Sequence, residues 1–371
     1  MSETHIDRGG YDPARDLAYA SGVDVPGATA RTSLPRISVI VPAYGVAALL
    51  PDALRSLQAQ TMSDWECIVI DDGAPDDVAG AVGPFLSDSR VTFVQTGNHG
   101  VSAARNAAIA ASHAPLVALL DGDDLFRPDY LARVVDLLEG DRDVRIATSN
   151  ARIFGAVERE SLVVTARQGT GDGIRADLSD VLDRSFNIYI GSAFRRADFD
   201  AVGGFDESMT HAEDFDLWVR LMMLGGPEAS HAAYIDAVLG EYRVRLGSAS
   251  AHGARMLRGN IRVYEKALTA LPESKAARTA QRMLDENRDA LAFEEAIERL
   301  IDGDSGALPQ LREAAAHSRR PIWSLAVALW SLCPPLASPM LRWRRHAHKR
   351  GGIDTLVPPL GAGVGAATEA A

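Results

Sequence analysis

The sequence predicts an α/β protein with a doubly wound, mainly parallel sheet and a C-terminal helical extension. Short β-branched runs alternate with segments of helical spacing in the first part of the chain. Such alternation is typical of parallel sheets that are covered by helices on both faces. The runs are continuously apolar, as expected of strands buried on both sides. Beyond about Gly253 the composition becomes helical and charged, which predicts the extension.

Strands and helices are expected in a regular order. The predicted strands span 37–41, 67–70, 91–95, 116–120, 188–194 and 234–245. Helical spacing predicts helices over 47–60, 102–112 and 214–224. Ser102 is the expected N-cap of the second helix, because a serine hydroxyl accepts a hydrogen bond from a free backbone N–H of the first turn.

Composition divides the chain into five parts. We expect a disordered N-terminal arm at 1–35, the α/β domain at 36–250, a helical extension at 251–318, an apolar and basic segment at 319–350, and a disordered tail at 351–371. The N-terminal region contains no apolar stretch of the kind found in secretory signals. No run of about 20 uninterrupted apolar residues predicts a membrane span.

Charge and cysteine content narrow the class of protein. The net charge of −12 argues against general nucleic-acid binding, which depends on Lys and Arg to neutralise phosphates. Cys67 and Cys333 are far apart and have no metal-ligand spacing, so they predict no disulfide framework. Their number fits a reducing compartment, and we therefore expect a cytoplasmic protein.

The strongest candidate site is the acidic run that follows the fourth predicted strand, Leu120-Asp-Gly-Asp-Asp-Leu125. Closely packed carboxylates repel one another, and a divalent cation relieves that repulsion. Oxygen ligands suit Mg²⁺ or Mn²⁺, and such an ion also stabilises a departing diphosphate. The alternative interpretation is a polar turn with a helix cap, since Asp124 precedes Pro128 and a helix.

Two further polar segments are expected at the same edge of the sheet, where ligands bind in doubly wound folds. Asp71-Asp72-Gly73 ends the second strand and suits recognition of a uracil or ribose; the alternative is an ordinary strand-to-turn transition. The glycine-bearing loop 97–106 enters a helix and carries Arg105, which suits a diphosphate. The alternative there is a capped surface helix with a solvated arginine.

A fourth segment, His211 to Trp218, begins a helix with acidic residues. The helix dipole alone favours acids at this position. The functional interpretation is that Asp214 is a general base, which takes the proton from an acceptor hydroxyl as its oxygen attacks an anomeric carbon.

In this order, these segments give residues 37–245 a resemblance to family-2 glycosyltransferases. The matching segments are 38–44 (SVIVPAY), 69–73 (VIDDG), 100–106 (GVSAARN), 119–124 (LLDGDD), 203–206 (GGFD) and 213–218 (EDFDLW). The resemblance implies a GT-A fold over 36–250. It also implies transfer of a sugar, with inversion by a single displacement, from a nucleotide-diphosphate donor to an acceptor hydroxyl.

The resemblance also implies roles for individual residues. Pro42 and Tyr44 match positions that contact the nucleotide base, Asp71 and Asp72 match acids for base and ribose, and Arg105 matches a basic residue near the base and diphosphate. Asp121 and Asp123 match the D-x-D pair, with Asp123 the expected direct ligand of Mn²⁺ or Mg²⁺. Asp214 matches the catalytic base, and Glu213 is expected to orient the acceptor.

Two departures from the family pattern refine this expectation. Many members carry a histidine after the Tyr-Arg strand, whereas Tyr242-Arg-Val-Arg245 offers Arg245, either as a diphosphate contact or as a solvated arginine. The Gln-x-x-Arg-Trp motif of processive polysaccharide synthases is missing, which favours a single-addition enzyme.

The C-terminal segment allows two interpretations. Residues 321–340 are apolar but broken by prolines, and a basic run follows at 342–350. Trp323, Trp330 and Trp343 would suit a membrane interface, and the basic run would attract acidic lipids. This interpretation predicts a peripheral protein at the inner face of the cytoplasmic membrane. A packed helix hairpin with a solvated basic end explains the pattern equally well.

The expected function is therefore that of a metal-dependent hexosyltransferase. The donor is expected to be a UDP-sugar and the acceptor a glycan or lipid-linked glycan, in envelope or extracellular polysaccharide biosynthesis. The alternatives are a non-catalytic scaffold with the same fold and a sugar nucleotidyltransferase. The latter would need a glycine-rich, lysine-bearing triphosphate loop near the first strand, and Pro42-Ala-Tyr44 is not such a loop.

Overall fold

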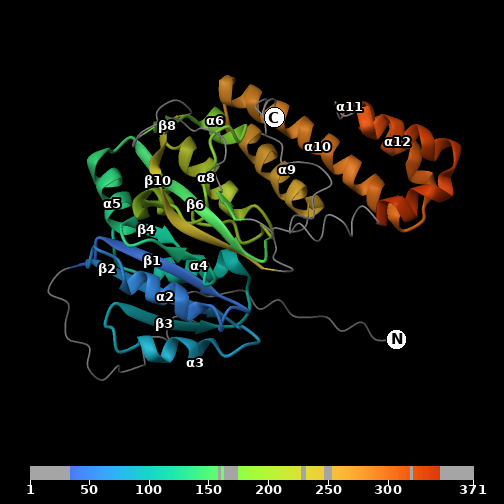
Figure 1. The fold of residues 1–371 in the computed structure, drawn as a ribbon. Coiled ribbons are helices and arrows are strands. Elements are labelled where there is room, and N and C mark those ends of the chain that lie inside the picture. The colour runs from blue at the N-terminus through green and yellow to red at the C-terminus, as the bar shows by residue number, and fades with distance from the viewer. Residues whose placement is uncertain are drawn as a thin grey trace, which may run out of the picture.

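The computed structural model describes residues 34–157, 160–162, 174–226, 231–245, 253–317 and 321–342. The arm expected at 1–35, apart from Leu34 and Pro35, and the tail expected at 351–371 lie outside the described residues. Most of the described chain forms one α/β body, from which a group of helices projects at one end (Figure 1).

The described strands form one ten-stranded sheet in the order β3-β2-β1-β4-β9-β6-β10-β5, with β7 paired to β6 and β8 to β10. Their bounds are β1 Ile37–Ala43, β2 Trp65–Asp72, β3 Val91–Thr96, β4 Leu116–Leu119, β5 Leu125–Phe126, β6 Val144–Gly155, β7 Ser161–Leu162, β8 Ile174–Ala176, β9 Ala193–Arg195 and β10 His231–Val244. The first four strands pair in parallel, and so do β6 and β10; β9 runs antiparallel between these two groups. The α/β class is confirmed.

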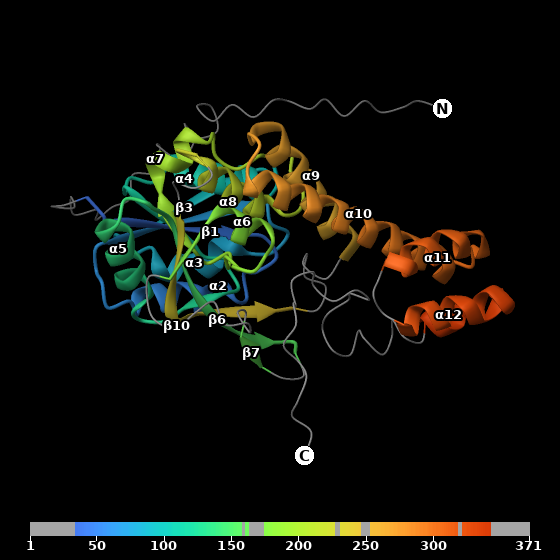
Figure 2. The same cartoon turned by 90° about the horizontal axis from the view of Figure 1, so that it is seen from above.

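Helices cover both faces of the sheet, as the continuous apolar strands require (Figures 1 and 2). The helices of this body are α2 Leu50–Gln58, α3 Val78–Val82, α4 Val101–Ala110, α5 Tyr130–Gly140, α6 Leu178–Leu182, α7 Arg196–Ala201 and α8 Glu213–Met223, with a 3-10 turn at Gly83–Phe85. Ile40 packs into a core with α4 and α8, whereas its neighbours Val39 and Val41 pack into a second core with α2 and α5. Successive side chains of β1 thus pack into the cores on opposite faces of the sheet.

The first turn of α4 differs from the expected one. Gly100, not Ser102, is the N-cap, and its φ of 91° is accessible to glycine at little cost. Ser102 is buried inside the helix, and its hydroxyl has no hydrogen-bond partner among the described residues. The N-cap prediction was wrong because the loop turns on glycine geometry rather than on a side-chain cap.

The middle of the sheet also differs. The strand expected at 188–194 is short, spanning Ala193–Arg195, because Tyr189 and Ser192 form a turn in which the Ser192 hydroxyl donates to the Tyr189 carbonyl at 2.5 Å. Tyr189 packs against Gly240 of β10, where a Cβ atom would lie 2.6 Å from the tyrosine oxygen. The long strand β6 was not expected from the sequence.

The C-terminal extension contains α9 Gly253–Ala270, α10 Lys275–Ile301, α11 Leu308–His317 and α12 Pro321–Leu332, with 3-10 turns at Ser305–Ala307 and Pro334–Leu336. Helix α9 packs on α8, α10 packs along α9, and α11 and α12 lie at the far end of α10 (Figure 2). Trp330 is only 3% exposed and packs with Leu300 and Leu341. It is therefore buried in the helical extension. The membrane interpretation had instead required Trp330 to lie at a membrane interface.

None of the helices in the described residues is both long enough and apolar enough to cross a membrane. Trp343 lies outside the described residues, as does the basic run apart from Arg342.

Candidate active site

The acidic run forms a tight turn directly after β4. The Asp124 N–H donates to the Asp121 carbonyl at 2.9 Å, and Gly122 separates Asp121 from Asp123. A Cβ atom at Gly122 would lie 2.9 Å from the Val46 side chain and 3.0 Å from the Pro42 carbonyl oxygen. The turn is thus pressed against the end of β1, so the polar ends of two neighbouring strands meet as expected.

Asp124 fastens this turn to β10. It is buried and accepts a hydrogen bond from the Arg243 backbone N–H at 2.7 Å, while the Arg243 side chain donates to the Asp123 carbonyl at 2.8 Å. Burial raises the pKa of Asp124, and the charge of Asp121 raises it further. The turn is therefore rigidly held, and Asp121 and Asp123 are left partly exposed. No sequence pattern indicated the role of Arg243.

Arg105 connects three of the sequence motifs. Its guanidinium donates to Asp121 Oδ1 at 2.8 Å and to Glu213 Oε1 at 2.9 Å, and its side chain is only 3% exposed. Burial lowers the pKa of Arg105, but the charges of Asp121 and Glu213 outweigh burial and raise the pKa overall. The alternative of a solvated arginine on a surface helix is therefore wrong. This bridge brings the D-x-D turn, α4 and the start of α8 to one place.

Asp214 follows Glu213 at the N-terminus of α8. Its Oδ1 accepts a hydrogen bond from the Phe215 N–H at 2.7 Å, and the side chain is partly buried. Burial raises the pKa of Asp214 above its ordinary value and the neighbouring charge of Glu213 adds to this, whereas Arg184 and Arg105 lower it. Ala212, which precedes the helix, has a φ of 58°, a left-handed conformation that is strained for alanine.

Asp71 and Asp72 are both engaged in shaping loops. Asp71 accepts from the Ala74 N–H at 2.8 Å and from the Gln95 side chain at 2.9 Å. Asp72 accepts from the backbone N–H groups of His99 and Gly100 at 2.8 and 2.9 Å, and so holds the loop before α4. Each carboxylate oxygen has a second lone pair, so these bonds leave acceptor capacity for a ligand.

The loop after β1 carries Tyr44, which is 52% exposed beside the buried end of the strand. This loop is held by Asp76, which accepts from the backbone N–H groups of Gly45 and Ala47 at 3.0 and 2.6 Å. Asp76 belongs to the loop after β2, so one carboxylate ties the ends of two adjacent strands. Sequence-based reasoning did not identify this residue, because an aspartate in a polar loop has no distinguishing pattern.

Arg245 lies at the end of β10 and reaches the acidic turn. Its Nε is 2.6 Å from Asp123 Oδ2, and one of its terminal nitrogens donates to the Gly45 carbonyl at 3.0 Å. It is therefore a partner of the expected metal ligand rather than a solvated strand arginine. Burial and the charge of Asp121 raise the pKa of Asp123, whereas Arg245 lowers it.

Asp121 and Asp123 suit a divalent cation that is shared with a substrate. Among the described residues, no group of three or more His, Cys, Asp or Glu side chains gathers in a way that could hold a metal. Mg²⁺ and similar ions often take only one or two carboxylates and complete their shell with substrate phosphates and water. The two acids fit that mode, provided that the ion replaces Arg245 beside Asp123.

Comparisons with known proteins agree with this geometry. Residues 38–203 match the family model described as "Glycosyl transferase family 2". Chondroitin synthase from Escherichia coli is 26% identical over 52% of this chain and 27% of its own length. Validoxylamine A glucosyltransferase from Streptomyces hygroscopicus is 29% identical over 55% of this chain and 54% of its own length. The chain spans about a quarter of the first curated relatives.

Solved structures show the same fold. Residues 1–349 of S. aureus TarS, in complex with UDP-GlcNAc, align with a TM-score of 0.58 at 18% identity, over 75% of this chain and 81% of that one. The mannosyltransferase PcManGT from Pyrobaculum calidifontis, in complex with GDP-Man and Mn²⁺, aligns with a TM-score of 0.53 at 21% identity, over 86% and 88% of the two chains. At these identities the likeness concerns the fold.

The sheet order, the acidic turn after β4 and the acids at the start of α8 define a protein of the GT-A glycosyltransferase class. The segment 38–203, a little less than half of the chain, carries the match to glycosyl transferase family 2. The resemblance noted from the sequence is confirmed at the level of family and fold.

Proposed function

We propose that this protein is an inverting glycosyltransferase that moves a sugar from a nucleotide-diphosphate donor to an acceptor hydroxyl. One observation carries the proposal: Arg105 joins Asp121 and Glu213 through bonds of 2.8 and 2.9 Å. Through this bridge Asp121, which we propose binds donor and cation, lies close to Glu213, and Glu213 directly precedes Asp214, the proposed base. A single displacement needs both sites at one place, because the attacking and departing oxygens lie on opposite sides of the anomeric carbon.

In the proposed reaction, the acceptor oxygen bonds to the anomeric carbon as the bond from that carbon to the diphosphate oxygen breaks. Asp214 takes the hydroxyl proton, and its raised pKa improves its strength as a base. Asp121 and Asp123 would hold Mn²⁺ or Mg²⁺. When bound, such an ion neutralises charge on the departing diphosphate. Arg105 fixes Glu213, which orients the acceptor hydroxyl.

The donor site is proposed to lie across the ends of β1, β2 and β4. Pro42 and exposed Tyr44 would contact the base, while Asp71 and Asp72 would contact the base and ribose. A UDP-hexose is the proposed donor, and a glycan or lipid-linked glycan of an envelope or extracellular polysaccharide is the proposed acceptor. The catalytic domain is proposed to span 36–250 and the helical extension 251–318.

We also propose that the segment 319–350 contacts an anionic membrane surface from the cytoplasmic side. Leu329, Leu332, Leu336 and Met340 are 45, 87, 42 and 44% exposed, although they are large apolar side chains. A basic sequence run, 342–350, follows them. Apolar contact together with basic charge is the combination that binds interfacial segments to acidic lipids. Sedimentation with vesicles of anionic and of neutral lipid tests this: L332E/L336E should reduce binding to anionic vesicles.

A nucleotide-sugar screen tests the central proposal. A ligand that binds only the folded protein raises its melting temperature. We expect a nucleotide-sugar to stabilise the protein more with Mn²⁺ than without it, and D123N to remove the Mn²⁺-dependent part. Stabilisation by nucleoside triphosphates alone would instead favour a nucleotidyltransferase.

A further inference from the structure

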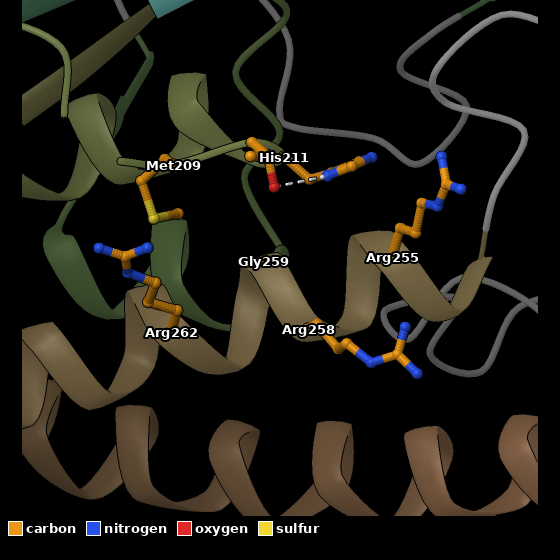
Figure 3. Close-up of a pocket in the computed structure, with 7 residues that line it drawn as sticks. Met209, His211, Arg255, Arg258, Gly259 and Arg262 are labelled. Carbon is orange, nitrogen blue, oxygen red and sulfur yellow. Dashed lines mark hydrogen bonds between the residues drawn. The ribbon is translucent and has the colours of Figure 1, made fainter. Parts of the chain in front are cut away.

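A basic pocket lies between α9 and the loop that precedes α8 (Figure 3). Its volume is about 380 Å³, and it is lined by Met209, Thr210, His211, Arg255, Arg258, Gly259 and Arg262. The three arginines fall on one face of α9, at positions i, i+3 and i+7. Such a concentration of cations stands out in a chain whose net charge is −12.

The arginines differ in how far other groups engage them. Arg262 donates to the Ser208 carbonyl and hydroxyl at 2.9 and 2.5 Å, and Arg258 pairs with exposed Glu295 at 2.8 Å. Arg255 has no hydrogen bond or ion pair within the described residues, and its side chain is exposed. In Figure 3, Arg262 lies beside Met209, whereas His211 extends from the loop on the side of Arg255. Arg255 can therefore donate to a ligand, and so can the N–H groups of Arg258 that Glu295 does not engage.

Both walls of the pocket, the loop before α8 and helix α9, lie near Asp214, the proposed base. His211 precedes Asp214 by three residues, which limits their Cα separation to roughly 11 Å. Gly259 lets α9 approach this loop, because a Cβ atom there would lie 2.7 Å from the His211 carbonyl oxygen and 3.0 Å from the Ala212 Cβ. If the reacting hydroxyl of an acceptor lies at Asp214, the units of the acceptor next to that hydroxyl would therefore reach the pocket.

We propose that this pocket binds an anionic group of the acceptor, a phosphate or a carboxylate, through Arg255 and Arg258. The inference rests on the proposed glycosyltransferase function and specifies a negatively charged acceptor. Arginine forks match the oxygens of phosphates and carboxylates, with charge-assisted hydrogen bonds. The nucleotide of the donor is assigned to the ends of β1, β2 and β4, so the pocket serves a second ligand.

Direct binding by the full chain tests the inference. The probes are a phosphodiester-linked glycerol oligomer, an oligogalacturonate and a neutral dextran oligosaccharide, with affinity measured by calorimetry. We expect one of the two anionic probes to bind and the dextran not to bind, and the stronger anionic probe identifies the group. R255Q/R258Q should lose about tenfold or more in that affinity, since both charge-assisted hydrogen bonds to the anion are removed. R255K/R258K should retain part of it.

A matched control is available on the neighbouring helix. Arg288 of α10 pairs with Glu265 at 2.8 Å, and its side chain is 53% exposed. Arg258 is similar, because it pairs with Glu295 at 2.8 Å and its side chain is 54% exposed. R288Q removes a similar cation outside the pocket and should leave probe affinity unchanged. The inference is overturned if R288Q weakens binding as much as R255Q/R258Q, if dextran binds equally, or if neither anionic probe binds.

Donor binding separates this inference from the proposed function. The same proteins are titrated with UDP-sugars and Mn²⁺. If R255Q/R258Q weakens donor affinity instead of probe affinity, the pocket serves the nucleotide and the inference is wrong. If the unaltered protein binds no nucleotide-sugar, the proposed function fails, and the acceptor assignment falls with it. If donor binding is intact and R255Q/R258Q binds the anionic probe normally, only the inference fails.

Discussion

Asp121 and Glu213 bind the same guanidinium, that of Arg105, although they belong to motifs far apart in the chain. The arginine is almost fully buried. Its two ion pairs therefore hold the motifs together, and they also affect the stability of the fold. A buried charge that loses its partner is costly, because its desolvation is no longer offset.

Replacing Arg105 by alanine should lower the free energy of unfolding by about 3–5 kcal/mol, since Asp121 and Glu213 would face each other without a cation. Denaturant unfolding measures this loss. R288Q removes a solvent-exposed ion pair and should cost at most about 1 kcal/mol. Equal, small losses for both variants would show that the bridge contributes little to stability.

Glu213 should set the pH at which activity falls on the acid side. Asp214 acts as a base only when it is deprotonated, so activity is lost as pH falls through its pKa. Burial and then the Glu213 charge raise that pKa, and E213Q removes the second contribution. The acid limb of the kcat profile should therefore move to lower pH in E213Q. An acid limb that stays in place or moves to higher pH would contradict this coupling.

Gly122 should tolerate no side chain, because a Cβ atom would press on Val46 and the Pro42 carbonyl. We expect G122A to cost about 1–3 kcal/mol of stability through overpacking and to weaken Mn²⁺-dependent donor binding as the acids shift. Thermal unfolding with and without donor measures both effects. The control is G83A, where a Cβ atom meets nothing within 4 Å and the backbone is right-handed. Matching behaviour of the two variants would refute the close-packing argument.

Arg245 should oppose cation binding in the absence of a diphosphate. Its guanidinium lies 2.6 Å from Asp123, and like charges at such distances repel. R245Q should therefore bind Mn²⁺ alone several-fold more tightly than the unaltered protein, as measured by electron paramagnetic resonance titration. Weaker binding of Mn²⁺ alone in R245Q would instead show that Arg245 supports the cation site.

The sequence predicted those parts of the fold that follow from local pattern. The runs that became β1, β2, β3 and β4 were identified because each is short, rich in apolar or β-branched residues, and followed by polar residues. Strand β6 was missed, since Val144–Gly155 mixes Arg, Thr, Ser and Asn with its apolar residues. Its partner is β10, which lies far along the chain, and that pairing leaves no local signal.

The candidate site shows the same division. Motif order singled out Asp121, Asp123 and Asp214 as candidates, but it did not show which residues hold them. The partners Arg243 and Asp76 act from other strands and loops, and ordinary polar residues in a sequence do not reveal such contacts. Ser102 matched the preference for an N-cap, yet the loop turned at Gly100 because glycine reaches a φ of 91°.

The most direct test of the proposed chemistry is product analysis of the purified protein with a nucleotide-sugar, Mn²⁺ and an acceptor that it binds. The unaltered protein should release a nucleoside diphosphate and form a glycoside of inverted anomeric configuration. D214N should bind donor normally but turn over at least about 10²-fold more slowly. Release of pyrophosphate, or undiminished turnover by D214N, would contradict the account.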